Sequence, residues 1–122
     1  MHRPVFFNPI QIQLPVGALT SIAHRISGLV LAIGLPLGVY LLHLSLRDAE
    51  AFAWVSALFD HWAIKLVAIG FVWALSHHIL AGVRHLLSDV DIGSTLSASR
   101  RSAFLVNIGG AAVALLAAGA LW

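Results

Sequence analysis

Apolar residues gather in three long stretches of the chain, and short polar segments separate them. The stretches are Ile26–Leu46, Leu66–Val83 and Ala103–Trp122, and none contains Asp, Glu, Lys or Arg. A helix rises about 1.5 Å per residue, so stretches of this length cross a hydrocarbon core of roughly 30 Å. The pattern predicts transmembrane helices over about 22–46, 63–87 and 102–122. We expect them to form one membrane domain that covers residues 1–122.

Prolines mark the N-terminal side of the first stretch. Residues 1–20 contain prolines as far as Pro15, so we expect this N-terminal segment to be non-helical. Thr20 or Ser21 then caps the first helix, because a hydroxyl at this position accepts a bond from an otherwise unpaired N–H. Pro36 lies inside the stretch and predicts a kink, which membrane helices tolerate.

The polar segments between the stretches predict two loops and an orientation. Residues 47–65 form the first loop and residues 89–101 the second. Three spans place the second loop on the side of the N terminus, and the arginines of that side are Arg3, Arg25, Arg84, Arg100 and Arg101. The first loop holds only Arg47 and Lys65, with three carboxylates. Positive charge collects on the inner side of membranes, so we predict an inner N terminus and an outer C terminus.

Composition agrees with an all-α membrane protein. Hydrophobic residues make up 60% of the chain and charged residues 10%, against about 25% charged in a soluble domain. Mean hydropathy is +0.94. The net charge of +2 is modest and the basic residues are scattered, so nucleic acid is not an expected partner. The absence of cysteine excludes disulfides, cysteine-ligated iron–sulfur clusters and covalent haem attachment.

The second apolar stretch ends in three histidines and an arginine at membrane depth: His77, His78, Arg84 and His85. Ionisable groups in this position are costly, and they mark a functional site by default. Residues seven apart on a helix differ by only about 20° in direction, so His78 and His85 share one face. Gly82 lies one turn after His78 and removes a side chain from that face, which leaves room for a flat, bulky group.

A second polar cluster begins the first span, where four residues share one helical face: Ser21, His24, Arg25 and Gly28. By topology this face lies at the same depth as Arg84 and His85. Two arginines and two histidines at one depth form a cationic patch, and such a patch attracts carboxylates. The propionates of a haem would satisfy it.

His78 lies about 10 Å deeper along its helix than His85. This separation matches the distance from a haem iron to its propionate tips when the haem plane stands along the membrane normal. The spacing therefore predicts His78 as the axial ligand of a non-covalent haem b. The third span contains no histidine, and His43 lies too far toward the other membrane surface. We expect the second axial ligand to come from another polypeptide.

Simpler interpretations apply to each histidine taken alone. His43 and His61 are expected to be hydrogen-bond partners or solvated side chains, and His77 is compatible with a structural role and with a role in the site. Snorkelling toward the membrane surface explains the members of the cationic patch one at a time. It does not explain why they share faces that can converge.

These residues resemble a known family in two ordered motifs. Residues 21–28 read S-I-A-H-R-I-S-G and resemble the signature S-I-x-H-R-x-[ST]-G, and residues 78–89 resemble H-x-x-x-G-x-R-H-x-x-x-D. Both motifs are found in the cytochrome b membrane-anchor subunit of succinate dehydrogenase (complex II). Arg3-Pro4 and Arg100-Arg101 are similar to further features of this family. The resemblance covers nearly the whole chain.

The resemblance implies roles for individual residues. It implies that His78 is the haem b axial ligand and that a sister anchor subunit supplies the other ligand and packs with this chain into a helical bundle. His24, Arg25 and His85 would then lie near the propionates, which is also the role expected of Arg84 from its depth. Ser21 and Arg25 would line the ubiquinone site. Asp89 is matched in the family without an assigned role.

The expected function follows from this resemblance. The chain would anchor the flavoprotein and iron–sulfur subunits to the bacterial inner membrane, or otherwise the mitochondrial one, surrounded by lipid. It would help to pass electrons from succinate to ubiquinone, and it would not be an enzyme on its own. One alternative is the anchor of a quinol:fumarate reductase. Another is a haem-free assembly or transport subunit that uses the cationic patch for lipid headgroups or proton relay.

Overall fold

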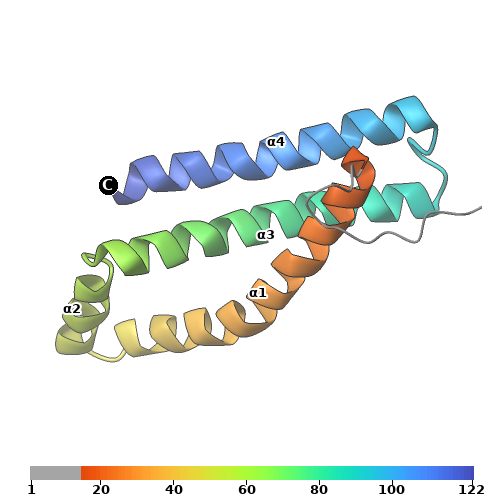
Figure 1. The fold of residues 1–122 in the computed structure, drawn as a ribbon. Helices are drawn as coiled ribbons and strands as arrows, with labels where there is room; N and C mark the ends of the chain where they lie inside the picture. Colours follow the sequence, from red (N-terminus) through yellow and green to blue (C-terminus); the bar gives the residue numbers. More distant parts are fainter. Residues whose placement is uncertain (1–14) are drawn as a thin grey trace, which may run out of the picture.

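The computed structural model describes residues 15–122, and Figure 1 shows its arrangement. This part of the chain forms four helices, which are α1 (Val16–Ser45), α2 (Ala49–Leu58), α3 (Trp62–Asp89) and α4 (Leu96–Leu121). The predictions for the segment before Pro15, including the resemblance at Arg3-Pro4, lie outside the described residues.

Three of the helices are long and apolar enough to cross a membrane, namely α1, α3 and α4. The prediction of an all-α chain with three membrane spans is therefore confirmed. The helices are longer than the apolar stretches alone predict. α1 starts at Val16 instead of near residue 22, and α4 starts at Leu96 instead of near residue 102. The added residues of α4 are mostly polar and carry no strong hydropathy signal, whereas those of α1 directly follow Pro15, which predicted a non-helical segment.

The predicted cap of the first helix at Thr20 or Ser21 is wrong. Pro15 precedes the first helical residue, and its φ of −63° suits a helix start because proline needs no N–H partner there. Thr20 is instead fully buried inside the helix, with its hydroxyl 2.9 Å from the Val16 carbonyl and 3.1 Å from the Asn107 amide of α4. A hydroxyl has one hydrogen, so both bonds form together only if Asn107 presents its NH₂ group.

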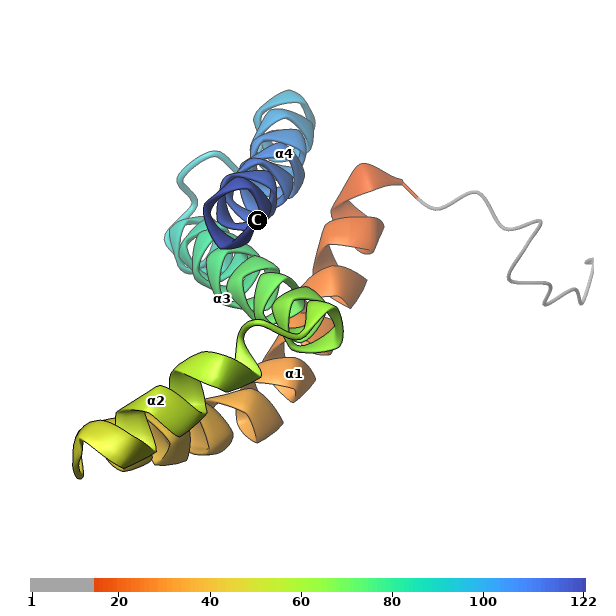
Figure 2. The same ribbon diagram turned by 90° about the vertical axis from the view of Figure 1, so that its left-hand side faces the viewer.

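The first predicted loop contains a helix. α2 occupies Ala49–Leu58, and the Asp48 carboxylate accepts a hydrogen bond from the Ala51 N–H at 2.7 Å. Alanine, leucine and glutamate favour a helix in this segment, but the charges at its ends suggested a loop. With ten residues α2 is too short to span a membrane, and it packs beside the end of α1 (Figure 2).

The second loop is shorter than predicted because α4 begins inside it. The Thr95 hydroxyl accepts a bond from the Ala98 N–H at 3.2 Å and caps α4. The turn before it uses left-handed backbone at Asp91 (φ 59°) and Gly93 (φ 71°). Arg100 and its neighbour Arg101 therefore lie within the first turns of α4.

α3 lies between α1 and α4 and packs against both (Figures 1 and 2). The α3–α4 contact uses small residues, since Ala74 and Ala81 are fully buried on α3 and Ala103 on α4. Gly110 shows how close the helices come, because a Cβ added there would lie 3.2 Å from the His77 Cβ. Small residues in membrane helices allow such close packing.

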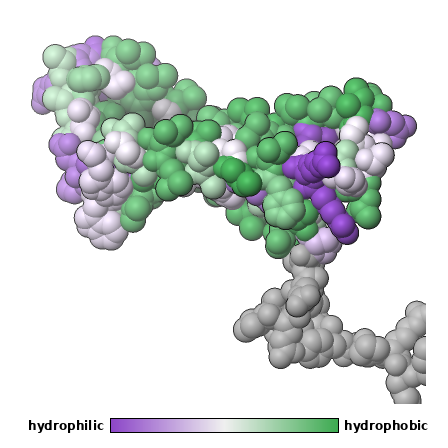
Figure 3. Space-filling model, turned by 90° about the horizontal axis from the view of Figure 1, so that it is seen from above, coloured by the Kyte–Doolittle hydropathy of each residue, from purple (hydrophilic) through white to green (hydrophobic). Residues whose placement is uncertain are grey.

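The surface between the ends of the molecule is largely apolar, whereas polar residues collect toward the two ends (Figure 3). Many large hydrophobic side chains are exposed, including Leu115 and Leu116 at 74% each. Such a surface is stable only against lipid or another protein. α1 is bent in its middle (Figure 1), which agrees with the kink predicted from Pro36.

Candidate functional site

Three imidazoles from two helices meet where α1 crosses α3. The His24 ring of α1 stacks on the His78 ring of α3, with centroids 4.1 Å apart and planes inclined by 10°. The His85 ring lies 5.1 Å from the His24 ring and is tilted by 57°. The structure thus brings together three of the predicted site residues from separate motifs. Their convergence is a tertiary feature that the helical faces only suggested.

Hydrogen bonds to α1 hold one edge of the His78 ring. Its Nδ1 lies 3.1 Å from the His24 carbonyl oxygen and 3.1 Å from the Ser27 hydroxyl. A carbonyl only accepts hydrogen bonds, so we assign the ring hydrogen to Nδ1. Nε2 then carries the lone pair, and it makes no hydrogen bond to any residue of 15–122. This is the form of neutral histidine that binds a metal through Nε2.

Two glycines make the close approach of these rings possible. A Cβ added at Gly28 would lie 3.0 Å from Cε1 of His78, which is tighter than an ordinary contact. A Cβ added at Gly82 would lie 3.9 Å from Nε2 of His24. The space at Gly82 therefore adjoins the His24 imidazole. Its use by a flat group stays a prediction.

The two predicted quinone residues of the first motif differ in exposure. Ser21 is partly buried, whereas Arg25 is exposed. Neither side chain makes a hydrogen bond within residues 15–122. Gly28 and His24 face α3, so the predicted single face of four residues is divided between a helix contact and an open surface. The quinone role predicted for Ser21 and Arg25 stays a prediction.

Arg84 bonds to α4, and its Nη2 also lies near the start of α1, 3.6 Å from a Cβ added at Gly17. Its Nε donates to the Ser102 hydroxyl at 3.0 Å, and its Nη2 donates to the Ser99 hydroxyl at 2.9 Å and to the Ser99 carbonyl at 3.2 Å. These bonds fasten the end of α3 to the start of α4. The propionate role of Arg84 stays a prediction.

The other histidines differ clearly in the exposed fraction of their side chains. His77 is 1% exposed and lies between α1 and α4, with Nε2 3.5 Å from the Thr20 carbonyl and its ring stacked on Trp73 at 5.3 Å. Of its two open interpretations, these contacts favour the structural one. His43 and His61 are exposed, which agrees with solvated side chains.

Sequence reasoning missed several polar residues that hold the site together. Ser27 is fully buried and contacts His78, although only the neighbouring positions of its motif were singled out. Its position three residues after His24 places it on the same side of α1, and this spacing was a usable signal. No comparable signal existed for Ser99 and Ser102, which follow a loop of unpredicted length.

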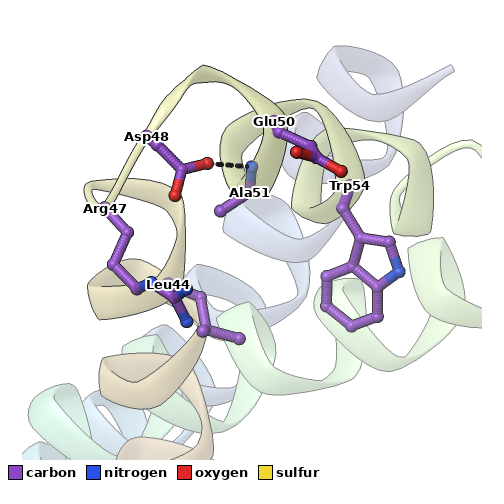
Figure 4. A pocket seen from close by; sticks show the side chains of 6 residues that line it. All are labelled: Leu44, Arg47, Asp48, Glu50, Ala51 and Trp54. Atoms are coloured by element: carbon purple, nitrogen blue, oxygen red, sulfur yellow. Dashed lines mark hydrogen bonds between the residues drawn. The ribbon is translucent and has the colours of Figure 1, made fainter.

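Within residues 15–122 no group of three or more His, Cys, Asp or Glu side chains is arranged to hold a metal ion. The donor set around His78 is a single imidazole, which fits one side of an iron that takes its second ligand from another chain. A surface hollow of about 350 Å³ lies at the α1–α2 corner and is lined by Arg47, Asp48, Glu50 and Trp54, among others (Figure 4). It does not include the histidines.

Comparison with known proteins identifies the family of this chain. Residues 1–118 match the model of the succinate dehydrogenase/fumarate reductase transmembrane subunit family. The chain belongs to this family. The resemblance found in the two motifs is thereby confirmed. The chain belongs to a transmembrane subunit family and has three helices long and apolar enough to span a membrane. It is therefore a multi-pass membrane protein.

Two relatives of this family member cover most of its length. The succinate dehydrogenase cytochrome b556 subunit of Coxiella burnetii (strain RSA 493 / Nine Mile phase I) is 39% identical over 106 residues, which are 85% of this chain and 84% of the relative. The protein of the same name from Paracoccus denitrificans is 33% identical over 115 residues, which are 94% of this chain and 88% of the relative.

Proposed function

We propose that the chain is the haem b-binding membrane anchor of a succinate dehydrogenase. The observation that carries this proposal is His78, which presents a single imidazole with Nδ1 hydrogen-bonded to the backbone of α1. Family membership and the names of both relatives support it. The chain is not catalytic on its own in this proposal. It binds a cofactor and completes a quinone site within a larger oxidoreductase.

The haem site is shared between two polypeptides. His78 is the axial ligand from this chain, and a sister anchor subunit supplies the ligand on the other face and completes the helical bundle. When bound, haem b supplies a one-electron carrier. His24 and His85 lie beside His78 and would contact the propionates, together with Arg25 and Arg84. Cationic and N–H donor groups stabilise carboxylates strongly at membrane depth.

In the quinone site, Ser21 and Arg25 have complementary roles. A serine hydroxyl donates a hydrogen bond to a quinone carbonyl, and an arginine stabilises the negative charge that develops there on reduction. The exposure of Arg25 and the partial burial of Ser21 support this role, because their polar atoms are not committed to other residues of 15–122. Ubiquinone is the substrate that the resemblance implies.

The remaining partners are the iron–sulfur subunit and the flavoprotein subunit, which pass electrons from succinate toward the quinone. The iron–sulfur subunit would meet the end of the bundle where α1 begins and α3 ends. The distribution of arginines supports an inner N terminus. The bacterial sources of both relatives support the bacterial inner membrane as the location.

The deciding experiment is a dithionite-reduced minus oxidised optical spectrum of the complex purified gently through this chain. We expect a b-type haem band and co-purifying flavin and iron–sulfur proteins. Succinate:quinone and quinol:fumarate activities measured on the same sample then select the physiological direction. An intact complex without a haem band would contradict the proposal and favour the haem-free assembly or transport alternative.

A further inference from the structure

Ser27 is a buried polar residue beside His78, the proposed ligand. The proposed function gives Ser27 no role. It is fully buried in α1, and its hydroxyl donates to the His24 carbonyl at 2.7 Å while lying 3.1 Å from Nδ1 of His78. We infer that Ser27 is a positioning residue that fixes the tautomer and orientation of His78 and strengthens it as an iron ligand. This inference rests on the proposed function, and it concerns a residue outside the predicted site.

The direction of each hydrogen bond follows from the number of hydrogens available. The Ser27 hydroxyl has one hydrogen, and the short contact to the His24 carbonyl uses it. The oxygen of Ser27 can then only accept from Nδ1–H of His78. The reverse assignment would leave Nδ1 and the His24 carbonyl oxygen facing each other as two acceptors 3.1 Å apart. That arrangement is repulsive, so Nδ1–H donates to both oxygens.

Two acceptors on α1 therefore share the single Nδ1–H of His78. An acceptor at this nitrogen increases the electron density of the ring and makes Nε2 a better ligand. It also prevents the other tautomer, in which Nε2 would carry the hydrogen and could not bind iron. Loss of the Ser27 hydroxyl leaves only the His24 carbonyl, which weakens both effects without removing the ligand.

Packing makes this arrangement specific. Gly28 follows Ser27 directly, and a Cβ there would lie 3.0 Å from Cε1 of His78, so the ring is held at its edge by backbone as well as by hydrogen bonds. The His24 ring covers one face at a centroid distance of 4.1 Å. The ring can rotate only if one of these contacts is lost. The Ser27 hydroxyl thus acts on an imidazole whose orientation is already restricted.

The test compares Ser27→Ala, Ser27→Thr and Ser45→Ala in the assembled, haem-containing complex. Ser45 is a matched control, because its hydroxyl also donates to the carbonyl three residues earlier in α1 at 2.7 Å but makes no hydrogen bond to a histidine of residues 15–122. The measurements are the haem midpoint potential by optical redox titration and the ferric haem electron paramagnetic resonance spectrum. Both respond to ligand strength and not merely to the amount of folded complex.

We expect Ser27→Ala to raise the haem midpoint potential and shift the ferric spectrum toward a weaker ligand field, with a roughly 10-fold loss of haem affinity. Ser27→Thr keeps the hydroxyl and should restore the unsubstituted values, and Ser45→Ala should not change them. If Ser27→Ala does not assemble, Ser27→Cys replaces it. The thiol is of similar size and a weaker acceptor, so a smaller shift in the same direction is expected.

An unchanged or lowered midpoint in Ser27→Ala, or in Ser27→Cys where it replaces it, would overturn the inference. An equal shift in Ser45→Ala would overturn it as well, because the effect would then belong to the helix and not to His78. Both results leave the proposed function standing. A complex without haem b in its unsubstituted form would instead overturn the proposed function and the inference together.

Discussion

The rings of His24 and His78 stack across the contact of α1 and α3, with centroids 4.1 Å apart and planes inclined by 10°. The two residues are 54 positions apart in the chain, and the Nδ1 of one also bonds to the backbone carbonyl of the other. The proposed iron ligand is therefore carried by α3 but oriented by α1. Changes on either helix should alter the haem, and this dependence can be tested.

Replacement of the proposed ligand should remove the haem without unfolding the chain. We expect His78→Ala to abolish the b-type band in the reduced minus oxidised spectrum, because no other histidine of residues 15–122 is proposed as an iron ligand. His43→Ala is the control, since His43 is exposed near the other end of α1. A normal band in His78→Ala would contradict the ligand assignment.

A methyl group at Gly28 should disturb the same ligand from the opposite helix. The added Cβ would lie 3.0 Å from Cε1 of His78, and overpacking of this kind costs about 1–3 kcal/mol. We expect Gly28→Ala to lower haem affinity by at least ~10-fold, measured by haem retention during purification and dilution. Gly38→Ala is the matched control on α1, because nothing lies within 4 Å of its added Cβ. Equal retention in the two variants would argue that His78 can move aside freely.

The proposed quinone residues should separate two activities of the complex. We expect Ser21→Ala and Arg25→Ala to reduce ubiquinone reduction by about 10-fold or more, since each removes a donor to the reacting carbonyl. Succinate oxidation by an artificial soluble acceptor should remain nearly normal. Arg47→Ala, which alters an arginine at the α1–α2 corner, controls for general charge effects. Equal losses in both assays would indicate a structural role.

The contact of Thr20 with Asn107 should stabilise the association of α1 with α4. The two polar groups lie 3.1 Å apart, and interhelical bonds in membranes average about 0.6 kcal/mol and reach about 1.7 kcal/mol. A double-mutant cycle of Thr20→Val and Asn107→Leu should give a coupling energy in this range. The free energy of unfolding of the complex in detergent is measured for each variant. Strictly additive losses would show that the contact contributes nothing to stability.

Some features of this protein depend only on the order of residues along the chain. The apolar stretches determined three membrane helices, since length and the absence of charge are sufficient for this conclusion. The spacing of His78 and His85 determined that they share a helical face. The two motifs determined the family, which the comparison confirmed. Helix ends were less predictable. Leu96 begins a polar turn that the hydropathy pattern does not distinguish from a loop, and Val16 directly follows a proline that predicted a non-helical segment.

Tertiary structure decided which polar groups meet. Arg84 has the reach to contact several neighbours, and only the position of α4 directs it to Ser99 and Ser102. Ser27 was inconspicuous in the sequence, because a serine in a membrane helix normally bonds to its own backbone. Its contact with His78 exists because α1 crosses α3 at a glycine. Composition and periodicity determine which elements form, whereas the crossing of helices determines which side chains can exchange hydrogen bonds.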